Sequence, residues 1–292
     1  MSLLVFDIGG QSVKYALWSN EAISEKSSFN TPRTWEELKQ EMHQAFLGLN
    51  SKYTISGVAI SCPGSVDSEK GIIKGISALP YIHNFNIIEE WEKLFKLPIS
   101  IENDANAAAL AELSYGVAKQ AENVVFIVIG SGIGGSVAIN GELLKGKHLF
   151  TGEIGYMLLD KDNTLSNLAS SLHQINRHNK NSPDHRIKDG IELFELAKAG
   201  NKEAESIVNE IYDSLAQGIY NISVMLDPDL IAIGGGISIR KDIVNQLTIR
   251  VNNLLDKQGA SDIKPNILTC KFYNDANLIG AAENFQRKFG NF

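Results

Sequence analysis

Short apolar runs alternate with longer amphipathic segments along most of the chain. The apolar runs predict strands at residues 3–8, 12–18, 55–62, 99–102, 124–129, 136–139, 230–233 and 267–272. Apolar positions with helical spacing predict helices at 35–49, 87–95, 105–115, 191–199, 204–226, 241–255 and 276–288. Strands that alternate with helices are typical of an α/β fold with mixed sheets covered by helices.

A strand that runs into glycines and then into a second strand occurs twice. The first strand is followed by Gly9-Gly10, and the strand that ends at residue 129 is followed by GSGIGG at 130–135. The second of these hairpins continues to Asn140-Gly141, a residue pair that strongly indicates a two-residue turn. The repeated pattern predicts two related halves, with two unrelated hairpins as the alternative.

The helix that ends near residue 115 and the second hairpin, which begins near 123, mark a division of the chain. We expect one α/β domain over residues 1–115 and a larger one over 116–275. Residues 161–188 are rich in Asn, His, Ser and Asp and look the least ordered. This segment is predicted to be a long surface loop, a kind of loop that often carries function.

Composition and charge narrow the function classes. Of the 292 residues, 43% are hydrophobic and 21% are charged, close to the average of soluble globular proteins. The net charge of −7 provides no positive field for nucleic acid or an anionic membrane. The N-terminus has neither the cationic segment of a secretory signal nor an apolar run long enough for a membrane span. Cys62 and Cys270 lie far apart in apolar runs and indicate reduced thiols, so we expect a cytoplasmic protein.

Both glycine turns are candidates for phosphate binding, because glycines let several backbone amides face one anion. Asp7, near the end of the first strand, would stand beside such phosphates and suits Mg²⁺ held through water. For Gly9-Gly10 a simple tight turn is the alternative. The segment 130–135 is neither a Walker loop nor a dinucleotide fingerprint, because a strand and not a helix follows it.

Carboxylates and glycines elsewhere add candidate chemistry. Asp104 follows a strand and starts an alanine-rich helix, so it is either the cap of that helix or a general base for a hydroxyl proton in phosphoryl transfer. Such a base needs no raised pKa, because positioning does most of the work. Glu153 offers a second carboxylate within GEIGY at 152–156. The three glycines at 234–236 would let a flat ring such as adenine lie against the backbone.

Together these segments resemble the ROK family of sugar kinases and sugar-responsive repressors, within the actin-like ATPase superfamily. The resemblance rests on DIGG at 7–10, CPG at 62–64, ENDANAAALAE at 102–112, GSGIGG at 130–135, GEIGY at 152–156 and DPDLIAIGGG at 227–236. It implies two actin-like (ribonuclease H-like) domains, with mixed sheets flanked by helices and the active site in the interdomain cleft. Residues 276–292 would return to the first domain. The resemblance also implies ATP, Mg²⁺, a sugar substrate and a homodimer.

The resemblance assigns roles to individual residues. Asp104 would be the catalytic base on a sugar hydroxyl, usually the one on C6, and Asp7 would hold Mg²⁺ through water. The sugar contacts would be Gly64, Asn84, Asn103, Asp104 and Glu153. The nucleotide contacts would be Asp7, Gly9, Gly10, Gln11, Lys14, Gly130, Ser131, Gly132, Gly134, Gly135, Gly234 and Gly235.

Three positions depart from the family pattern. Gln11 stands where Thr is common after DIGG. Tyr156 replaces the family's zinc-binding His, and the downstream Cys-rich zinc motif is missing, so no zinc site is expected. Ser166 aligns with a Glu that binds the anomeric hydroxyl in the family, and a small Ser would leave room for a sugar substituted there. These departures resemble the β-glucoside kinase branch, which phosphorylates the nonreducing glucose of cellobiose-type disaccharides and aryl glucosides.

The leading hypothesis is therefore an ATP-dependent kinase that acts on the C6 hydroxyl of a hexose, in particular the glucosyl unit of a β-glucoside such as cellobiose. Glucokinase, fructokinase and N-acetylmannosamine kinase are alternatives within the family. A sugar-sensing regulator without enzymatic activity is disfavoured, because the first strand starts at residue 3 without a preceding helix-turn-helix and the net charge is −7. A nonenzymatic actin-like assembly protein would share the ATP loops but would not need Asn103, Asp104 and Glu153.

Overall fold

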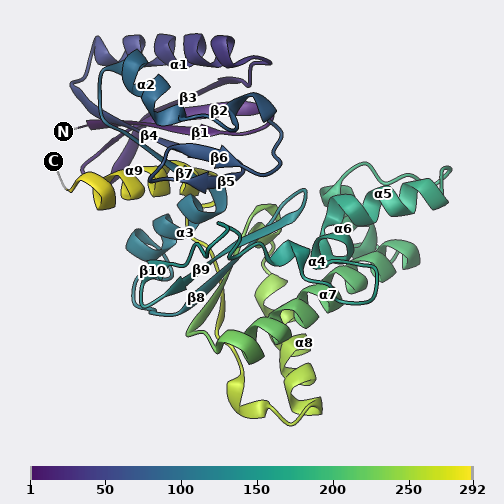
Figure 1. Ribbon diagram of the computed structural model, residues 1–292. Coiled ribbons are helices and arrows are strands. Elements are labelled where there is room, and N and C mark those ends of the chain that lie inside the picture. Colours follow the sequence, from purple (N-terminus) through teal and green to yellow (C-terminus); the bar gives the residue numbers. More distant parts are fainter. Residues whose placement is uncertain (1, 291–292) are drawn as a thin grey trace. The chain divides into compact units, whose positions relative to one another are not determined.

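The computed structural model describes residues 2–290, which divide into two compact units (Figure 1). Unit 1 comprises residues 2–119, Gly146–Phe150 and 274–290, and unit 2 comprises Gln120–Lys145 and Thr151–Tyr273. Each unit contains a mixed sheet flanked by helices, which confirms the predicted fold class. Within residues 2–290, no helix has the length and apolar character needed to cross a membrane.

The main sheet of unit 1 has five strands in the order β3-β2-β1-β4-β7. They are β1 (Ser2–Ile8), β2 (Ser12–Ser19), β3 (Ala22–Asn30), β4 (Ile55–Cys62) and β7 (Ile99–Asn103). Strands β1, β4 and β7 are parallel, whereas β2 and β3 pair antiparallel. The carboxyl ends of the parallel strands therefore lie along one edge. A small second sheet pairs β5 (Ser65–Asp67) with β6 (Ile72–Lys74).

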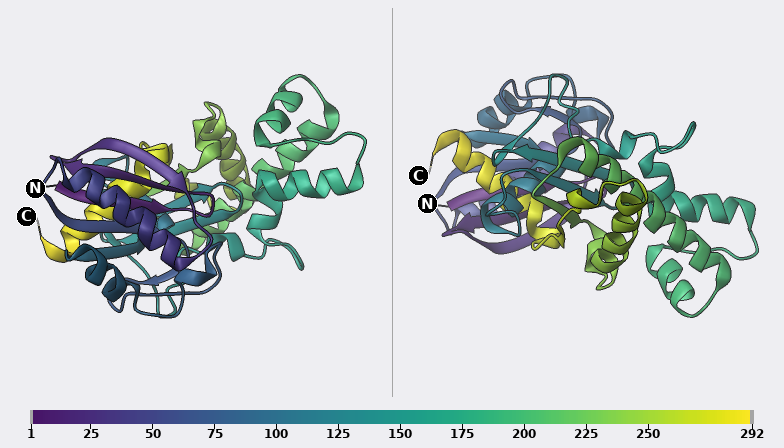
Figure 2. Two further views of the ribbon diagram at one scale, coloured as in Figure 1. Left: turned by 90° about the horizontal axis from the view of Figure 1, so that it is seen from above. Right: turned by 90° about the horizontal axis from the view of Figure 1, so that it is seen from below.

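Helices cover both faces of the main sheet in unit 1. One face carries α1 (Trp35–Asn50) and α2 (Ile87–Phe95), and the other carries α3 (Asp104–Tyr115) and α9 (Ala276–Phe289) (Figure 2). Because side chains alternate along a strand, Leu4 and Phe6 of β1 join the core beneath α1 and α2. Asp7 is directed to the opposite face, which α9 covers.

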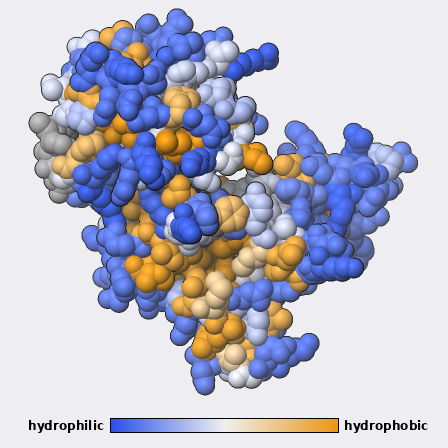
Figure 3. Space-filling view, viewed as in Figure 1, coloured by the Kyte–Doolittle hydropathy of each residue, from blue (hydrophilic) through white to orange (hydrophobic). Residues whose placement is uncertain are grey.

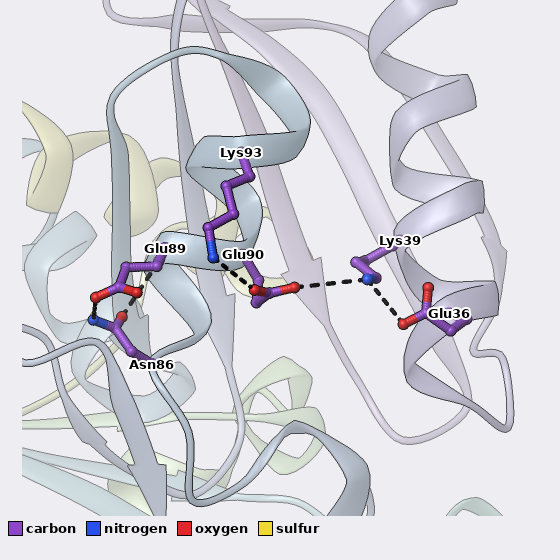
Figure 4. A network of polar contacts seen from close by, with 6 residues as sticks. All are labelled: Glu36, Lys39, Asn86, Glu89, Glu90 and Lys93. Atoms are coloured by element: carbon purple, nitrogen blue, oxygen red, sulfur yellow. Dashed lines mark hydrogen bonds and ion pairs between the residues drawn. The ribbon is translucent and has the colours of Figure 1, made fainter.

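Polar contacts join α1 and α2 at the surface of unit 1 (Figure 4). Lys39 Nζ of α1 lies 3.8 Å from the carboxylate of Glu90 in α2. Asn86 caps α2, because its Oδ1 accepts the Glu89 N–H at 3.3 Å and its Nδ2 donates to the Glu89 carboxylate at 2.7 Å. Ion pairs at the protein surface add little stability, so the buried apolar faces of these helices hold them on the sheet.

Helix α9 crosses α3 at very close range. A Cβ on Gly280 of α9 would lie 1.6 Å from the carbonyl oxygen of Ala107 in α3, so this crossing requires glycine. On the sheet side, the ring of Phe285 covers Gly57 of β4, where a Cβ would lie 2.2 Å from the ring. Two glycines therefore let the last helix pack tightly on both α3 and the sheet.

The sheet of unit 2 repeats the strand order of unit 1, as β10-β9-β8-β11-β12. Its strands are β8 (Val124–Ile129), β9 (Ile133–Ile139), β10 (Glu142–Leu143), β11 (Leu230–Gly234) and β12 (Ile267–Thr269). Strands β8, β11 and β12 are parallel, and β9 and β10 pair antiparallel. Asn140 and Gly141, with φ of 53° and 75°, form the predicted turn between β9 and β10. The shared strand order agrees with the prediction of two related halves.

Helices pack around the sheet of unit 2. They are α4 (Leu165–Ala169), α5 (Ser171–Asn181), α6 (Gly190–Lys198), α7 (Lys202–Leu226) and α8 (Ile243–Lys257). Short 3₁₀ helices of the chain are η1 (Pro80–Ile82), η2 (Ile154–Tyr156), η3 (Gly236–Ile239), η4 (Ser261–Ile263) and η5 (Tyr273–Asp275).

The prediction of a long surface loop over residues 161–188 is wrong, because α4 and α5 occupy much of this segment. Thr164 and Asn167 form a reciprocal cap that starts α4. Leu165 and Ile175 are buried in the core of unit 2 and hold the two helices there. Hydrophilic side chains dominate the exposed surface over α5 (Figure 3), which explains why its sequence resembles that of a loop.

We expect Gly280→Ala to lower the free energy of unfolding by about 3 kcal/mol, because the added methyl group must displace α9 from α3. Gly48→Ala is the matched control, since no atom of residues 2–290 outside the neighbouring backbone lies within 4 Å of its Cβ position in α1. This change should raise the free energy of unfolding by about 0.5–1 kcal/mol, because alanine is the better helix former. The midpoints of urea-induced unfolding measure both effects. Equal midpoints for Gly280→Ala and the unmodified protein would contradict the packing described for α9.

Candidate active site

Several predicted site residues lie along the carboxyl edge of the main sheet in unit 1. Asp7 is near the end of β1, Gly64 follows β4, and Asn103 ends β7. These three strands are parallel neighbours, and their register places Ser61 of β4 directly beside Asp7. In open α/β sheets, ligands bind outside the carboxyl ends of the strands. The fold therefore brings residues from three separate motifs to one edge that is suited to a ligand.

The carboxylate of Asp7 is held from two elements. Its Oδ1 accepts hydrogen bonds from the Ser61 hydroxyl at 3.2 Å and from Asn277 Nδ2, on α9, at 2.9 Å. Its Oδ2 lies 3.6 Å from Lys14 Nζ, and Asp7 as a whole is only 7% exposed. A fixed carboxylate next to a glycine turn fits Mg²⁺ that is bound through water beside phosphates. Sequence reasoning missed Ser61 and Asn277, which belong to no motif and carry no local signal of this role.

The turn between β1 and β2 is closed by its own backbone and by Thr31. The Gly9 N–H donates to the Ser12 carbonyl at 3.0 Å, and the Thr31 hydroxyl donates to the Gly9 carbonyl at 2.6 Å. A Cβ on Gly10 would lie 2.9 Å from a neighbouring alanine methyl carbon. Gln11 follows as an exposed residue. The turn thus presents backbone rather than side chains, as a phosphate-binding turn requires.

Asn103, and not Asp104, caps α3. Its Oδ1 accepts the Asn106 N–H at 3.1 Å. Its Nδ2 donates to Asp104 Oδ1 and to the Gly64 carbonyl, each at 3.0 Å. Asp104 Oδ1 also accepts the Ala105 N–H at 2.8 Å. The interpretation of Asp104 as the cap is therefore wrong, because the preceding Asn already fills that position. Asp104 is instead a half-buried carboxylate in the first turn of α3, where the helix dipole favours negative charge.

Gly64 and Asn84 lie on either side of β6. Gly64 has a φ of 101°, and a Cβ there would lie 2.9 Å from Ile73, so this position requires glycine. Asn84 has a φ of 67° and donates its N–H to the Ile73 carbonyl at 2.9 Å. Gly64 reaches Asn103 through its carbonyl, as described above, whereas Asn84 is exposed.

In unit 2, two serines at α4 fasten the loop of sequence GSGIGG. The Ile133 N–H donates to Ser166 Oγ at 3.1 Å, and the Ser170 hydroxyl donates to the Ser131 carbonyl at 2.6 Å. A Cβ on Gly132 would lie 3.2 Å from Ser166 Oγ. The hydroxyl of Ser166, a residue that the sequence predicts to contact the sugar, therefore holds the loop at 130–135 in place.

The two glycine segments of unit 2 lie against each other. Gly235, which follows Gly234 at the end of β11, has a φ of 82°, and a Cβ there would lie 2.2 Å from the Ile129 carbonyl oxygen. The Cβ positions of Gly130 and Gly134 face open space, with no atom of residues 2–290 outside their own neighbourhood within 4 Å. This combination of close backbone approach and open space is a cradle that fits the phosphates of a nucleotide.

Glu153 follows a tight backbone contact. A Cβ on Gly152, where φ is 91°, would lie 2.7 Å from the carbonyl oxygen of Gly135 in β9. Glu153 is partly buried, and this desolvation raises the pKa of its carboxyl above the usual value.

Tyr156, at the end of η2, is 65% exposed. Among the described residues, no group of three or more His, Cys, Asp or Glu side chains is arranged to hold a metal ion.

A cavity of about 520 Å³ lies beside Arg240, which follows η3. The guanidinium of Arg240 lies 4.0 Å from the ring centroid of Phe194, and its Nη2 donates to Asp242 at 3.1 Å. The Ser238 N–H, within η3, donates to the Gly235 carbonyl at 3.1 Å, but neither of these residues lines the cavity.

Comparison with known proteins agrees with the order and spacing of these motifs. The sequence profile of the ROK family matches residues 3–288. The chain is 32% identical to a β-glucoside kinase of Listeria monocytogenes, over 98% of this chain and 97% of that protein. It is 29% identical to a β-glucoside kinase of Klebsiella pneumoniae, over 99% of this chain and 97% of that protein. The crystal structure of a ROK family protein from Streptococcus pneumoniae in complex with sucrose has a TM-score of 0.90 and 35% identity, over 99% of both chains. The chain therefore belongs to the ROK family.

Proposed function

We propose that this chain is an ATP-dependent sugar kinase that phosphorylates the C6 hydroxyl of a hexose unit, preferably the glucosyl unit of a β-glucoside such as cellobiose. The observation that carries the proposal is that Asn103 and Asp104 lie at the same sheet edge as Asp7. A proton acceptor and a carboxylate suited to Mg²⁺ at one edge are what phosphoryl transfer to a hydroxyl requires. The β-glucoside kinases of Listeria monocytogenes and Klebsiella pneumoniae among its relatives support the choice of substrate class.

The glycine segments would bind the nucleotide. Backbone amides of the Gly9-Gly10 turn and of the loop at 130–135 would contact its phosphates, apart from amides such as those of Gly9 and Ile133, which already donate within the protein. Asp7 would hold Mg²⁺ through water. Adenosine would lie against Gly234-Gly235, at the end of β11. When bound, ATP supplies the γ-phosphoryl group, and Mg²⁺ neutralises charge on the phosphate oxygens.

Asp104 would take the proton from the attacking hydroxyl. Its Oδ1 is oriented by the Ala105 N–H and by Asn103 Nδ2, so rotation of the carboxylate would break two hydrogen bonds. Position matters more than basicity in this role, because the proton leaves late in a loose transition state. Asn103 would hold Asp104 in place, and the second lone pair of its Oδ1 could accept a bond from a sugar hydroxyl.

Two observations favour a glycoside over a free hexose. In the family pattern, a Glu at the position of Ser166 lies near the anomeric hydroxyl of the sugar. Ser166 is smaller and has no carboxylate, and its hydroxyl accepts the Ile133 N–H. The relative from Streptococcus pneumoniae binds sucrose, in which the anomeric carbon of glucose is substituted. Glu153 would remain as a contact for another sugar hydroxyl. A free hexose or N-acetylmannosamine as the preferred substrate is the alternative, which a panel of sugars distinguishes.

We expect Asp104→Asn to lower kcat about 10²–10⁴-fold with little change in KM for ATP, because the amide keeps the shape of the side chain but cannot accept the proton. Coupled measurement of ADP release gives both constants. Asp213→Asn, a change at an exposed carboxylate of α7, is the matched control and should keep full activity. The kinase proposal fails if the unmodified protein shows no sugar-dependent ADP release. Full activity of Asp104→Asn would instead overturn the role of Asp104 alone.

Ser166→Glu should lower kcat/KM for cellobiose about tenfold more than kcat/KM for glucose, because a carboxylate near C1 crowds a substituent there. Ser166→Ala removes the bond to the Ile133 N–H without adding a carboxylate, and should therefore affect both sugars equally. Steady-state kinetics with cellobiose, an aryl β-glucoside, glucose, fructose and N-acetylmannosamine measure these effects. A preference of the unmodified protein for a free sugar over cellobiose would rule out the glycoside specificity.

A further inference from the structure

Asn277 connects the end of the chain to the candidate active site. It lies in the first turn of α9, and its Nδ2 donates to Asp7 Oδ1 at 2.9 Å, across 270 positions of sequence. Ser61 donates to the same oxygen at 3.2 Å. Neither Asn277 nor Ser61 belongs to a sequence motif with an assigned functional role.

The packing of α9 determines the position of Asn277. Gly280, about one turn further along α9, lies against the backbone of Ala107. The neighbours Ala276 and Leu278 are buried. A shift of this helix would force backbone atoms together, so Asn277 is a donor at a fixed position and cannot follow a carboxylate that moves.

The two donors bind one side of the Asp7 carboxylate. Both contact Oδ1, whereas Oδ2 lies 3.6 Å from Lys14 Nζ. Rotation of the carboxylate group would lengthen or misalign both hydrogen bonds, which sets the direction of Oδ2. Because an amide and a hydroxyl are uncharged, these two donors orient Asp7 without neutralising it, and Lys14 is the charged group that faces Oδ2.

We propose that Asn277 is a positioning residue for the binding of a magnesium nucleotide. Together with Ser61, it orients the Asp7 carboxylate that would hold Mg²⁺ through water. Asn277 acts through Asp7 and does not itself contact the nucleotide. This inference rests on the proposed kinase function, and it makes the last helix of the chain a determinant of metal-dependent affinity at the first strand.

Calorimetric titration with ADP, in the presence of Mg²⁺ and in the presence of EDTA, tests the inference without turnover. Asn277→Ala should weaken the binding of MgADP about tenfold, because Asp7 loses one of its two donors, and should leave the binding of ADP in EDTA unchanged. Ser61→Ala should act in the same direction. Asn284→Ala is the matched control on the same helix, because Asn284 Nδ2 donates to the Ile101 carbonyl at 3.1 Å and does not reach Asp7. It should bind MgADP as the unmodified protein does.

Kinetics provide a second measurement. The Mg²⁺ concentration that gives half-maximal activity should rise in Asn277→Ala, while KM for the sugar should stay the same. Thermal unfolding establishes that each variant is folded, and if Asn277→Ala does not fold, Ser61→Ala decides the question.

The outcomes separate this inference from the proposed function. Affinity for MgADP equal to that of the unmodified protein, or an equal loss with and without Mg²⁺, would overturn the positioning role. If the unmodified protein itself binds no MgADP, the proposed kinase function fails, and this inference fails with it.

Discussion

The contact between Gly280 and the backbone of Ala107 is the constraint on which the candidate site of unit 1 depends. It lets α9 lie close enough to α3 and the sheet for Asn277 to reach Asp7. Phe285, packed over Gly57, extends the same close approach along the sheet. The close packing of α9 thus places the amide of Asn277, near the end of the chain, beside the carboxylate of Asp7 in the first strand.

The strand order explains why the chemistry gathers where it does. In each unit, three parallel strands end at one edge, and most of the motifs lie at or just after the ends of those strands, with GEIGY at 152–156 as an exception. The two edges differ in what they offer. The edge of unit 1 presents the polar side chains of Asn103 and Asp104 together with Asp7, whereas the edge of unit 2 presents glycine backbone around Gly130 and Gly235. One repeated frame can therefore provide both carboxylates and a phosphate cradle.

The sequence predicted correctly those elements whose local pattern of residues is distinctive, and it failed for elements without such a pattern. The turn at Asn140-Gly141 was predictable because its shape depends on those two residues alone. Strand β3 was missed, because its largely exposed residues show no run of apolar positions. Helices α4 and α5 were mistaken for a loop, because few of their residues, such as Ile175, are both apolar and buried. Both Asn and Asp cap helices well, so only the hydrogen bonds distinguish Asn103 from Asp104 as the cap.

By itself, the sequence determined the mixed α/β class, the family and the candidate residues of the glycine turns and Asp104. These depend on residue type, short-range spacing and the order of motifs, all of which can be read along one chain. Only the tertiary structure decided that Ser61 and Asn277 share Asp7, that Ser166 fastens the loop at 130–135, and that Arg240 borders a cavity. Such contacts join residues that are far apart in sequence, and the packing of helices and strands, which no local pattern specifies, brings them together.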